Sequence, residues 1–268
     1  MSRVRRRLIL TAVQVAVVAA FLVAWQFLPD ISFLSSRFHW LDPFFISSPD
    51  HVARKVYDIS VGHGPITVWR YAWETISSAL LGTVIGMAAG GIVGLLLSNS
   101  RFLSDVFQPI VVALNAVPRI ALIPVVVIIL GPTSQASVAI AVMVVFFIAF
   151  YSAYEGGRTV SSNVMRNSIL LGASKYQMAR HLRLPYAFAW MMASLPLAAT
   201  FALLSVVTGE ILTGTAGMGQ LITQALAFSD SALTFAVVII LSIVGIAVTG
   251  VATLIRRALL RWWDSTLT

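Results

Sequence analysis

Two polar side chains that could act on a solute, Asn115 and Arg119, lie four residues apart in the otherwise apolar stretch QPIVVALNAVPRIALIPVVVIILGP. A cation at mid-membrane depth is costly, so it normally faces a water-filled cavity or a partner group. On a continuous helix the two side chains would share one face. Two interpretations follow: a structural arginine that snorkels or pairs with an acid or a carbonyl, and a cation that lines a pathway for an anionic solute.

Glu210 is an acidic candidate at the expected membrane boundary. It opens the segment GEILTGTAGMGQLITQALAFSD, which is too short to cross a membrane twice and too hydrophobic for a free loop. We therefore expect this segment to fold back against the other helices. Glu210 either pairs with a basic group or forms part of an external gate, and we group it with Asn115 and Arg119 as candidate pathway residues.

The sequence contains no recognisable catalytic or metal-binding constellation. It has no cysteine, which excludes disulfides and thiolate chemistry, and its four histidines have no metal-ligand spacing: His39, His51, His63 and His181. No Gly-rich loop with Lys-Ser/Thr is present to bind nucleotide phosphates. We expect a chain that is not an enzyme, with no cofactor of its own, so that any energy source lies on another polypeptide.

The elements around these residues are membrane spans. Hydrophobic residues make up 59% of the 268 residues and charged residues only 10%, against about 25% in soluble domains. Apolar runs of about 20 residues predict an all-α integral membrane protein with six transmembrane helices. The spans are expected at 8–28, 75–97, 106–130, 136–154, 187–209 and 233–255. We expect one domain over 1–268, with an anchor helix within 1–30, an external segment at 29–74, a short interfacial helix near 50–60 and core spans within 75–255.

The net charge of +8 reflects topology and not a nucleic-acid partner. With both termini in the cytoplasm, thirteen of the eighteen basic residues fall on the inner side. This bias sets the orientation by the positive-inside rule and predicts a multi-pass membrane protein with both termini in the cytoplasm.

The second span carries a glycine every four residues: Gly82, Gly86, Gly90 and Gly94. On a helix these form one bare stripe where a neighbouring backbone can approach closely. Ordinary packing within one subunit is the simpler interpretation, and a surface that slides as a pathway opens is the alternative.

The loop between the fourth and fifth spans, residues 155–185, is longer than a connection requires. It contains five Lys/Arg and no acid after Glu155. Gly172 predicts the end of one short helix, and Ser174 with Gln177 predicts a capping box at the start of another. Pro185 is expected to fix where the next span begins. Two helices in a cytoplasmic loop indicate a surface that docks a partner.

This loop resembles that of bacterial ABC-importer permeases, in which Glu-Ala-Ala is followed by three residues, Gly, nine residues and Ile-x-Leu-Pro. Leu182 stands at the Ile position, Pro185 at the Pro and Gly172 at the Gly, while Arg166, Asn167 and Ser168 replace the opening triplet, a cation standing where the family has a carboxylate. Segments 48–52, 118–124, 171–174, 209–210 and 217–219 also resemble the nitrate/sulfonate/taurine-type permeases, so the likeness covers roughly residues 46–263.

The resemblance implies a type I importer-like fold and a permease that contacts cytoplasmic ATPase subunits through this loop. The implied contact residues are Arg166, Asn167, Ser168, Gly172, Ala173, Ser174, Leu182 and Pro185. It also implies a place in a bacterial inner membrane, a second permease copy, an external solute-binding protein, and ATP and Mg on the ATPase subunits. An ion-gradient-driven secondary transporter or channel is the alternative, but such proteins show inverted repeats or paired intramembrane acids, and this sequence shows neither. A membrane-embedded enzyme is disfavoured by the missing catalytic groups.

Overall fold

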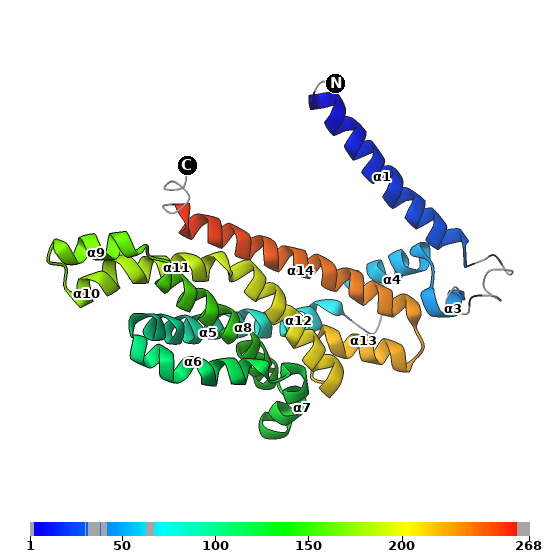
Figure 1. The fold of residues 1–268 in the computed structure, drawn as a ribbon. Coiled ribbons are helices and arrows are strands. Elements are labelled where there is room, and N and C mark those ends of the chain that lie inside the picture. Colours follow the sequence, from blue (N-terminus) through cyan, green and yellow to red (C-terminus); the bar gives the residue numbers. More distant parts are fainter. Residues whose placement is uncertain (1–2, 30, 32–37, 39–41, 63–66, 262–268) are drawn as a thin grey trace. The chain divides into compact units, whose positions relative to one another are not determined.

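The computed structural model describes residues 3–29, 31, 38, 42–62 and 67–261, and every regular element in these ranges is helical, as predicted. His39, His63 and part of the external segment 29–74 lie outside the described residues. The elements (Figure 1) are α1 (Arg3–Phe27), α3 (Pro43–Ile46), α4 (Pro49–Val61), α5 (Val68–Asn99), α6 (Arg101–Ala116), α7 (Arg119–Leu130), α8 (Ser134–Arg158), α9 (Ser162–Leu170), α10 (Lys175–Met178), the π-helix η2 (Ala179–Arg183), α11 (Leu184–Ala193), α12 (Leu195–Thr213), α13 (Met218–Ala227) and α14 (Ser231–Leu259).

Among the described residues, five helices are long and apolar enough to cross a membrane: Ile9–Phe27, Val68–Asn99, Ser134–Arg158, Leu195–Thr213 and Ser231–Leu259. A sixth span exists only if the pair Phe102–Ala116 and Arg119–Leu130, which meet at 87°, is counted as one. The span predicted over 106–130 is therefore a broken one, divided between α6 and α7. Val117 is extended (φ −68°, ψ 126°) because the residue before a proline avoids the helical region, and Pro118 cannot donate to the previous turn.

Two other predicted boundaries are corrected. Helix α5 begins at Val68, seven residues before the predicted start at 75, so it takes in the end of the predicted external segment. The predicted span 187–209 is divided between α11 and α12 at Ser194, two residues before Pro196. The helix expected near 50–60 is present as α4.

The chain divides into two compact units, residues 1–69 with 221–240 and residues 70–220 with 241–268. In the first unit, the end of α1 is tied to α4: Gln26 Nε2 donates to Asp50 Oδ1 at 3.1 Å. Hydrogen bonds from Ser48 and Gln26 lower the pKa of Asp50 to about 2. Lys55 of α4 forms a 2.8 Å ion pair with Asp230, the residue before α14.

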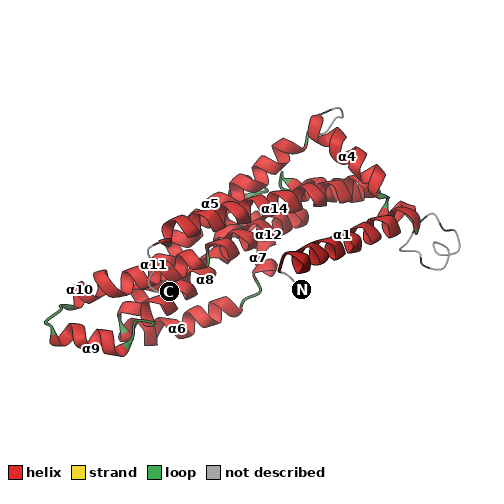
Figure 2. Ribbon diagram, turned by 90° about the horizontal axis from the view of Figure 1, so that it is seen from above, coloured by secondary structure: helices red, strands yellow, loops and turns green. Residues whose placement is uncertain are grey.

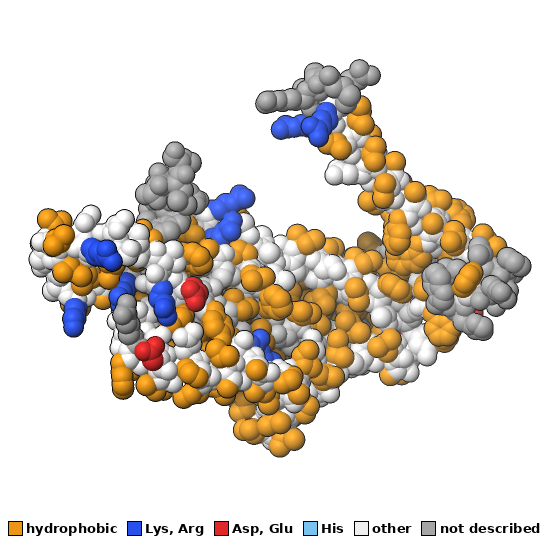
Figure 3. Space-filling model, in the orientation of Figure 1, with side chains coloured by type: hydrophobic (Ala, Val, Ile, Leu, Met, Phe, Trp, Pro, Cys, Tyr) orange, Lys and Arg blue, Asp and Glu red, His pale blue; other side chains and the backbone are white. Residues whose placement is uncertain are grey.

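The second unit is built around α8, which packs against α5, α7, α11 and α12. Many of its buried positions are small or β-branched, as at Ala141, Val145 and Ala149, while Phe150 and Tyr154 are buried aromatic positions nearer its end. The short helices α9 and α10 project beyond the ends of α5, α6 and α8 in both views (Figures 1 and 2). Hydrophobic side chains dominate the surface over the spans, and basic side chains gather at the end that carries α9 and α10 (Figure 3).

The four ladder glycines of α5 all lie against α8. A Cβ at Gly82 would meet Ala141, one at Gly86 would lie 2.7 Å from Val145 Cβ, one at Gly90 would meet the Phe146 carbonyl oxygen, and one at Gly94 would meet the Phe150 carbonyl oxygen. The contacts at Gly90 and Gly94 are to backbone, which cannot move aside. The two helices are therefore in direct backbone contact along the stripe, the geometry of ordinary close packing.

This contact predicts that Gly90→Ala destabilises the protein. The added methyl must displace the α8 backbone, and overpacking of this kind costs about 1–3 kcal/mol. Gly250→Ala in α14 is the matched control, because a Cβ there has no neighbour within 4 Å and Ala favours a helix over Gly by about 1 kcal/mol. Thermal unfolding in detergent should show a lower midpoint for Gly90→Ala only. Equal midpoints in the two variants would show that α5 and α8 are not in close contact.

Candidate functional site

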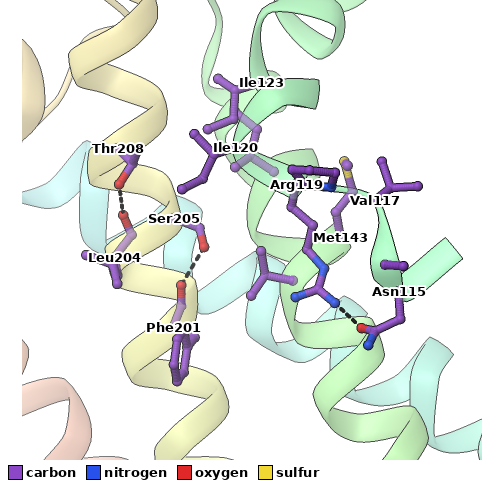
Figure 4. Close-up of a pocket in the computed structure, with 14 residues that line it drawn as sticks. Asn115, Val117, Arg119, Ile120, Ile123, Met143, Phe201, Leu204, Ser205 and Thr208 are labelled. Carbon is purple, nitrogen blue, oxygen red and sulfur yellow. Dashed lines mark hydrogen bonds between the residues drawn. The ribbon is translucent and has the colours of Figure 1, made fainter. Parts of the chain in front are cut away.

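The bend between α6 and α7 opens a cavity of about 600 Å³ in the second unit. Its lining comes from the α6–α7 junction, α8 and α12 (Figure 4): Asn115, Ala116, Val117, Pro118, Arg119, Ile120, Ile123, Ile140, Met143, Val144, Phe201, Leu204, Ser205 and Thr208. Both sides of the α6–α7 break, from Asn115 to Ile120, contribute to this lining.

Arg119 supplies the charge of this cavity. One guanidinium nitrogen donates to Asn115 Oδ1 (Figure 4), and the guanidinium carbon lies 4.8 Å from the centroid of the Phe147 ring. Its Nε is buried without a hydrogen-bond partner. None of the ion pairs among the described residues includes Arg119. The amide and the aromatic face stabilise the cation without neutralising its charge.

The expectation that Asn115 and Arg119 share one helical face is corrected. Asn115 lies in the last turn of α6, and Arg119 opens α7 beyond the break. Their side chains still meet, because the bend brings the end of one helix beside the start of the next. The four-residue spacing thus identified two residues that do contact each other, although they lie on two helices and not on one helical face.

Most of the remaining lining is apolar, with two hydroxyl groups from α12. Ser205 Oγ donates to the Phe201 carbonyl oxygen at 2.7 Å, and Thr208 Oγ1 donates to the Leu204 carbonyl oxygen at 2.8 Å. Both bonds are visible in Figure 4. Because each hydroxyl uses its hydrogen within its own helix, only its lone pairs face the cavity. Phe147, Ser205 and Thr208 were not predicted from the sequence, since spacing along one helix gives no sign of contacts between helices.

Glu210 lies outside the residues that line this cavity, so the structure does not bring it together with Asn115 and Arg119. Its side chain is fully buried and accepts hydrogen bonds from Thr75 Oγ1 at 2.8 Å and from the Gly219 N–H at 2.8 Å. Thr75 Oγ1 in turn accepts from the Met218 N–H at 2.8 Å. The carboxylate thus caps the first residues of α13 and fastens them to α5.

Glycine is required beside this carboxylate, because a Cβ at Gly217 would overlap the Glu210 carboxyl group. The motif of Gly209, Glu210 and residues 217–219 is therefore explained by the buried hydrogen bonds that join Glu210 to Thr75 and to the start of α13. Within the described residues Glu210 has no basic partner, so of the two alternatives the structure does not show the pairing with a cation.

The loop at 155–185 contains the predicted helix, turn and capping box. Helix α9 ends in a Schellman turn, in which the Gly172 N–H donates to the Ile169 carbonyl oxygen and the Ala173 N–H to that of Ser168, both at 2.9 Å. Ser174 and Gln177 form the reciprocal capping box. Leu170 and Leu171 at the turn are 84% and 88% exposed, and Arg166 and Asn167 are also exposed.

The structure explains one detail of the loop and corrects another. Gly172 has φ +84° and open space around its Cβ position, so glycine is needed for the left-handed backbone and not for room. Pro185 does not start a separate span, because α10, η2 and α11 follow one another without a break. The π-helical turn before Pro185 accommodates the missing N–H and the bulk of the ring, with the Leu184 N–H donating to the Ala179 carbonyl oxygen.

The chain was compared with known proteins. Residues 82–263 match the family model described as "Binding-protein-dependent transport system inner membrane component". The riboflavin transport system permease protein RibX of Chloroflexus aurantiacus is 25% identical over 220 residues, 82% of this chain and 81% of the relative. The taurine transport system permease protein TauC of Escherichia coli K12 is 22% identical over 250 residues, 92% of this chain and 88% of the relative.

A putative aliphatic sulfonates transport permease protein, SsuC of Bacillus subtilis, is 26% identical over 204 residues, 76% of this chain and 71% of the relative. Among solved structures, an inward-facing MetNI methionine ABC transporter matches with a TM-score of 0.62 and 20% identity, covering 71% of this chain and 95% of that chain. This likeness supports the type I importer-like fold. The chain belongs to the binding-protein-dependent transport system inner membrane components, and it is a multi-pass permease subunit of an ABC importer and not an enzyme.

Proposed function

We propose that this permease conducts a small anionic solute, and that the cavity around Arg119 is part of the pathway. The observation that carries the proposal is the unneutralised guanidinium in a cavity of about 600 Å³. The free energy of burying a lone cation is offset when water or a solute anion occupies the cavity. Asn115 and Phe147 orient the guanidinium and leave part of it free to bind.

The lining favours an anion that also has an apolar part. Ile120, Met143 and Phe201 would contact such a part, while Ser205 and Thr208 offer hydrogen-bond acceptors. Two of the relatives are named for sulfonates or taurine, whose sulfonate group is anionic at neutral pH. Another relative is named for riboflavin, so the substrates for which the relatives are named differ widely. The inference therefore rests on the cavity and not on the relatives.

The proposed partners follow from the loop and from the family. Two cytoplasmic ATPase subunits, which bind ATP and Mg, would contact the surface formed by α9, the Gly172 turn and α10. Residues 166–168, 172–174, Leu182 and Pro185 make up or support that surface. A second permease copy would complete the pathway, and an external binding protein would deliver the solute. Both termini are placed in the cytoplasm by the distribution of basic residues.

In the proposed cycle, closure of the ATPase subunits displaces the loop and the spans then alternate between outward-open and inward-open arrangements. The chain itself supplies the pathway and the docking surface. The ion-gradient alternative has no comparable support, since the family transports with binding proteins.

We expect the cavity to select anions electrostatically, which can be measured without knowing the solute. The cysteine-free chain allows one reporter, Ser205→Cys. The quantity measured is the ratio of two modification rates at this cysteine, that of anionic 2-sulfonatoethyl methanethiosulfonate over that of the cationic trimethylammonium reagent. We expect this ratio to be higher in Ser205→Cys than in the Ser205→Cys/Arg119→Gln variant. At the dielectric constant typical of protein surfaces a neighbouring charge contributes on the order of 1–3 kcal/mol, so the ratio should fall about tenfold or more.

Thr159→Cys, in the exposed start of the loop, is the control, and its reagent ratio should not depend on Arg119. An unchanged ratio at Ser205→Cys after removal of Arg119 would contradict the proposal.

The loop contact is tested at Gly172. Gly172→Leu should lose most of its association with the ATPase subunit, because a leucine at φ +84° costs about 1 kcal/mol or more and distorts the Schellman turn. Gly172→Asn should keep most of it, because asparagine tolerates left-handed backbone. Co-purification of the ATPase from membranes, normalised to the permease recovered, is the measurement. Equal recovery with both variants would show that the turn is not part of the contact.

A further inference from the structure

An arginine from the end of the loop helices is bound to the far end of α5. Arg183 Nη1 donates to the Asn99 carbonyl oxygen at 2.8 Å, to the Ser98 carbonyl oxygen at 3.2 Å and to Asn99 Oδ1 at 3.2 Å. These carbonyls belong to the last turn of α5, where they lack partners within the helix and where the helix dipole is negative. The Arg183 guanidinium, 84 residues after Asn99 in the chain, thus caps the C-terminus of α5.

The same region fixes the start of α6. Ser100 caps α6 by accepting a hydrogen bond from the Leu103 N–H, one residue beyond the Arg183 contact. At the end of α8, Arg158 donates to the hydroxyl of Tyr154, and Ser104 of α6 is hydrogen-bonded to the same hydroxyl. Tyr154 is buried, and its ring is stacked on Phe150 at 5.8 Å between centroids. The first turn of α6 is therefore fastened to the end of α8, and the turn before it to the loop helices.

Helix α6 connects this region with the cavity. It runs from Arg101 to Ala116 and ends at the extended residue Val117, where the chain bends by 87° into α7. Asn115, in its last turn, holds the Arg119 guanidinium. A displacement of the α5–α6 turn would be carried along about 24 Å of helix to the cavity.

The π-helical turn explains how Arg183 is presented to α5. η2 has one more residue per turn than an α-helix would, and Arg183 is its last residue. Arg180, in the same turn, is exposed and donates only to Tyr176 Oη at 3.1 Å within its own helical segment. The two arginines therefore share a helix and a charge but differ in whether they bind α5.

We propose that Arg183 is a positioning residue for transport: it joins the 155–185 loop to the α5–α6 turn, so that loop movement is transmitted through α6 to Asn115 and Arg119. The proposal rests on the proposed ATPase contact of that loop. If Arg183 only capped α5, its loss would lower stability without separating ATP hydrolysis from movement at the cavity.

The test uses the complete complex of the full chain with its ATPase subunits in proteoliposomes, and Ser205→Cys as reporter. The probe is 2-sulfonatoethyl methanethiosulfonate, applied without nucleotide and after trapping with ATP and vanadate. We expect its modification rate to differ between the two states by about fivefold or more. In Arg183→Gln the ATPase should remain bound and hydrolyse ATP, while the difference in rate falls to less than twofold.

Two further variants make the outcome decisive. Arg180→Gln should keep the full nucleotide-dependent difference, and Arg183→Lys should keep part of it, because an ammonium can still bind the α5 carbonyls. Should Arg183→Gln fail to assemble, Arg183→Lys carries the test, with an intermediate difference expected at normal ATPase binding.

Three outcomes would overturn the proposal. Arg183→Gln could keep the full nucleotide-dependent difference in modification rate, or Arg183→Lys could keep it when Arg183→Gln does not assemble. The third outcome is that Arg180→Gln loses this difference as much as Arg183→Gln does. A different result would count against the proposed function instead of the role of Arg183. In that result the Ser205→Cys chain, with Arg183 unchanged, binds no ATPase or shows the same modification rate with and without nucleotide.

Discussion

The direct backbone contact between α5 and α8 is the constraint on which the second unit depends. Lipid provides no hydrophobic drive for helices to associate, so van der Waals contact at small residues must supply it. Gly82, Gly86, Gly90 and Gly94 allow that contact, and the opposing positions of α8 are mainly alanine, valine and backbone. With α5 held against α8 over residues 82–94, the parts on either side become anchoring points, Thr75 for Glu210 and the last carbonyls for Arg183.

The anchoring points and the broken span divide the unit into parts of different rigidity. Near Thr75, the fully buried Glu210 carboxylate accepts hydrogen bonds from a hydroxyl and a backbone N–H, and no cation pairs with it among the described residues. Glycine is required at 217, because a Cβ there would overlap the carboxyl group. At the α6–α7 junction, by contrast, the backbone hydrogen-bond ladder is interrupted by Pro118. An interrupted ladder resists bending less than an intact one. The charged residue of the cavity, Arg119, lies directly after this interruption.

Placing Arg119 there also reconciles its charge with the membrane. A guanidinium in a straight, lipid-facing helix would be driven to the interface. The bend provides instead an amide partner, an aromatic face and a cavity that water can enter. The leucines of the Gly172 turn, Leu170 and Leu171, are likewise not buried within this chain. They are consistent with a partner surface at the end that carries the basic side chains.

The sequence alone determined the helical membrane class, the family, the glycine stripe, the turn at Gly172 and the capping box, because each depends on local spacing, local backbone preference or composition. It also identified Asn115 and Arg119 as a pair. Only the tertiary structure decided that the pair meets across a break, that Glu210 braces α13 outside the cavity, and that Phe147, Thr75 and Arg183 contact residues far away in the chain. Those contacts depend on how helices approach one another, and one amino-acid sequence does not encode that approach in any short-range pattern.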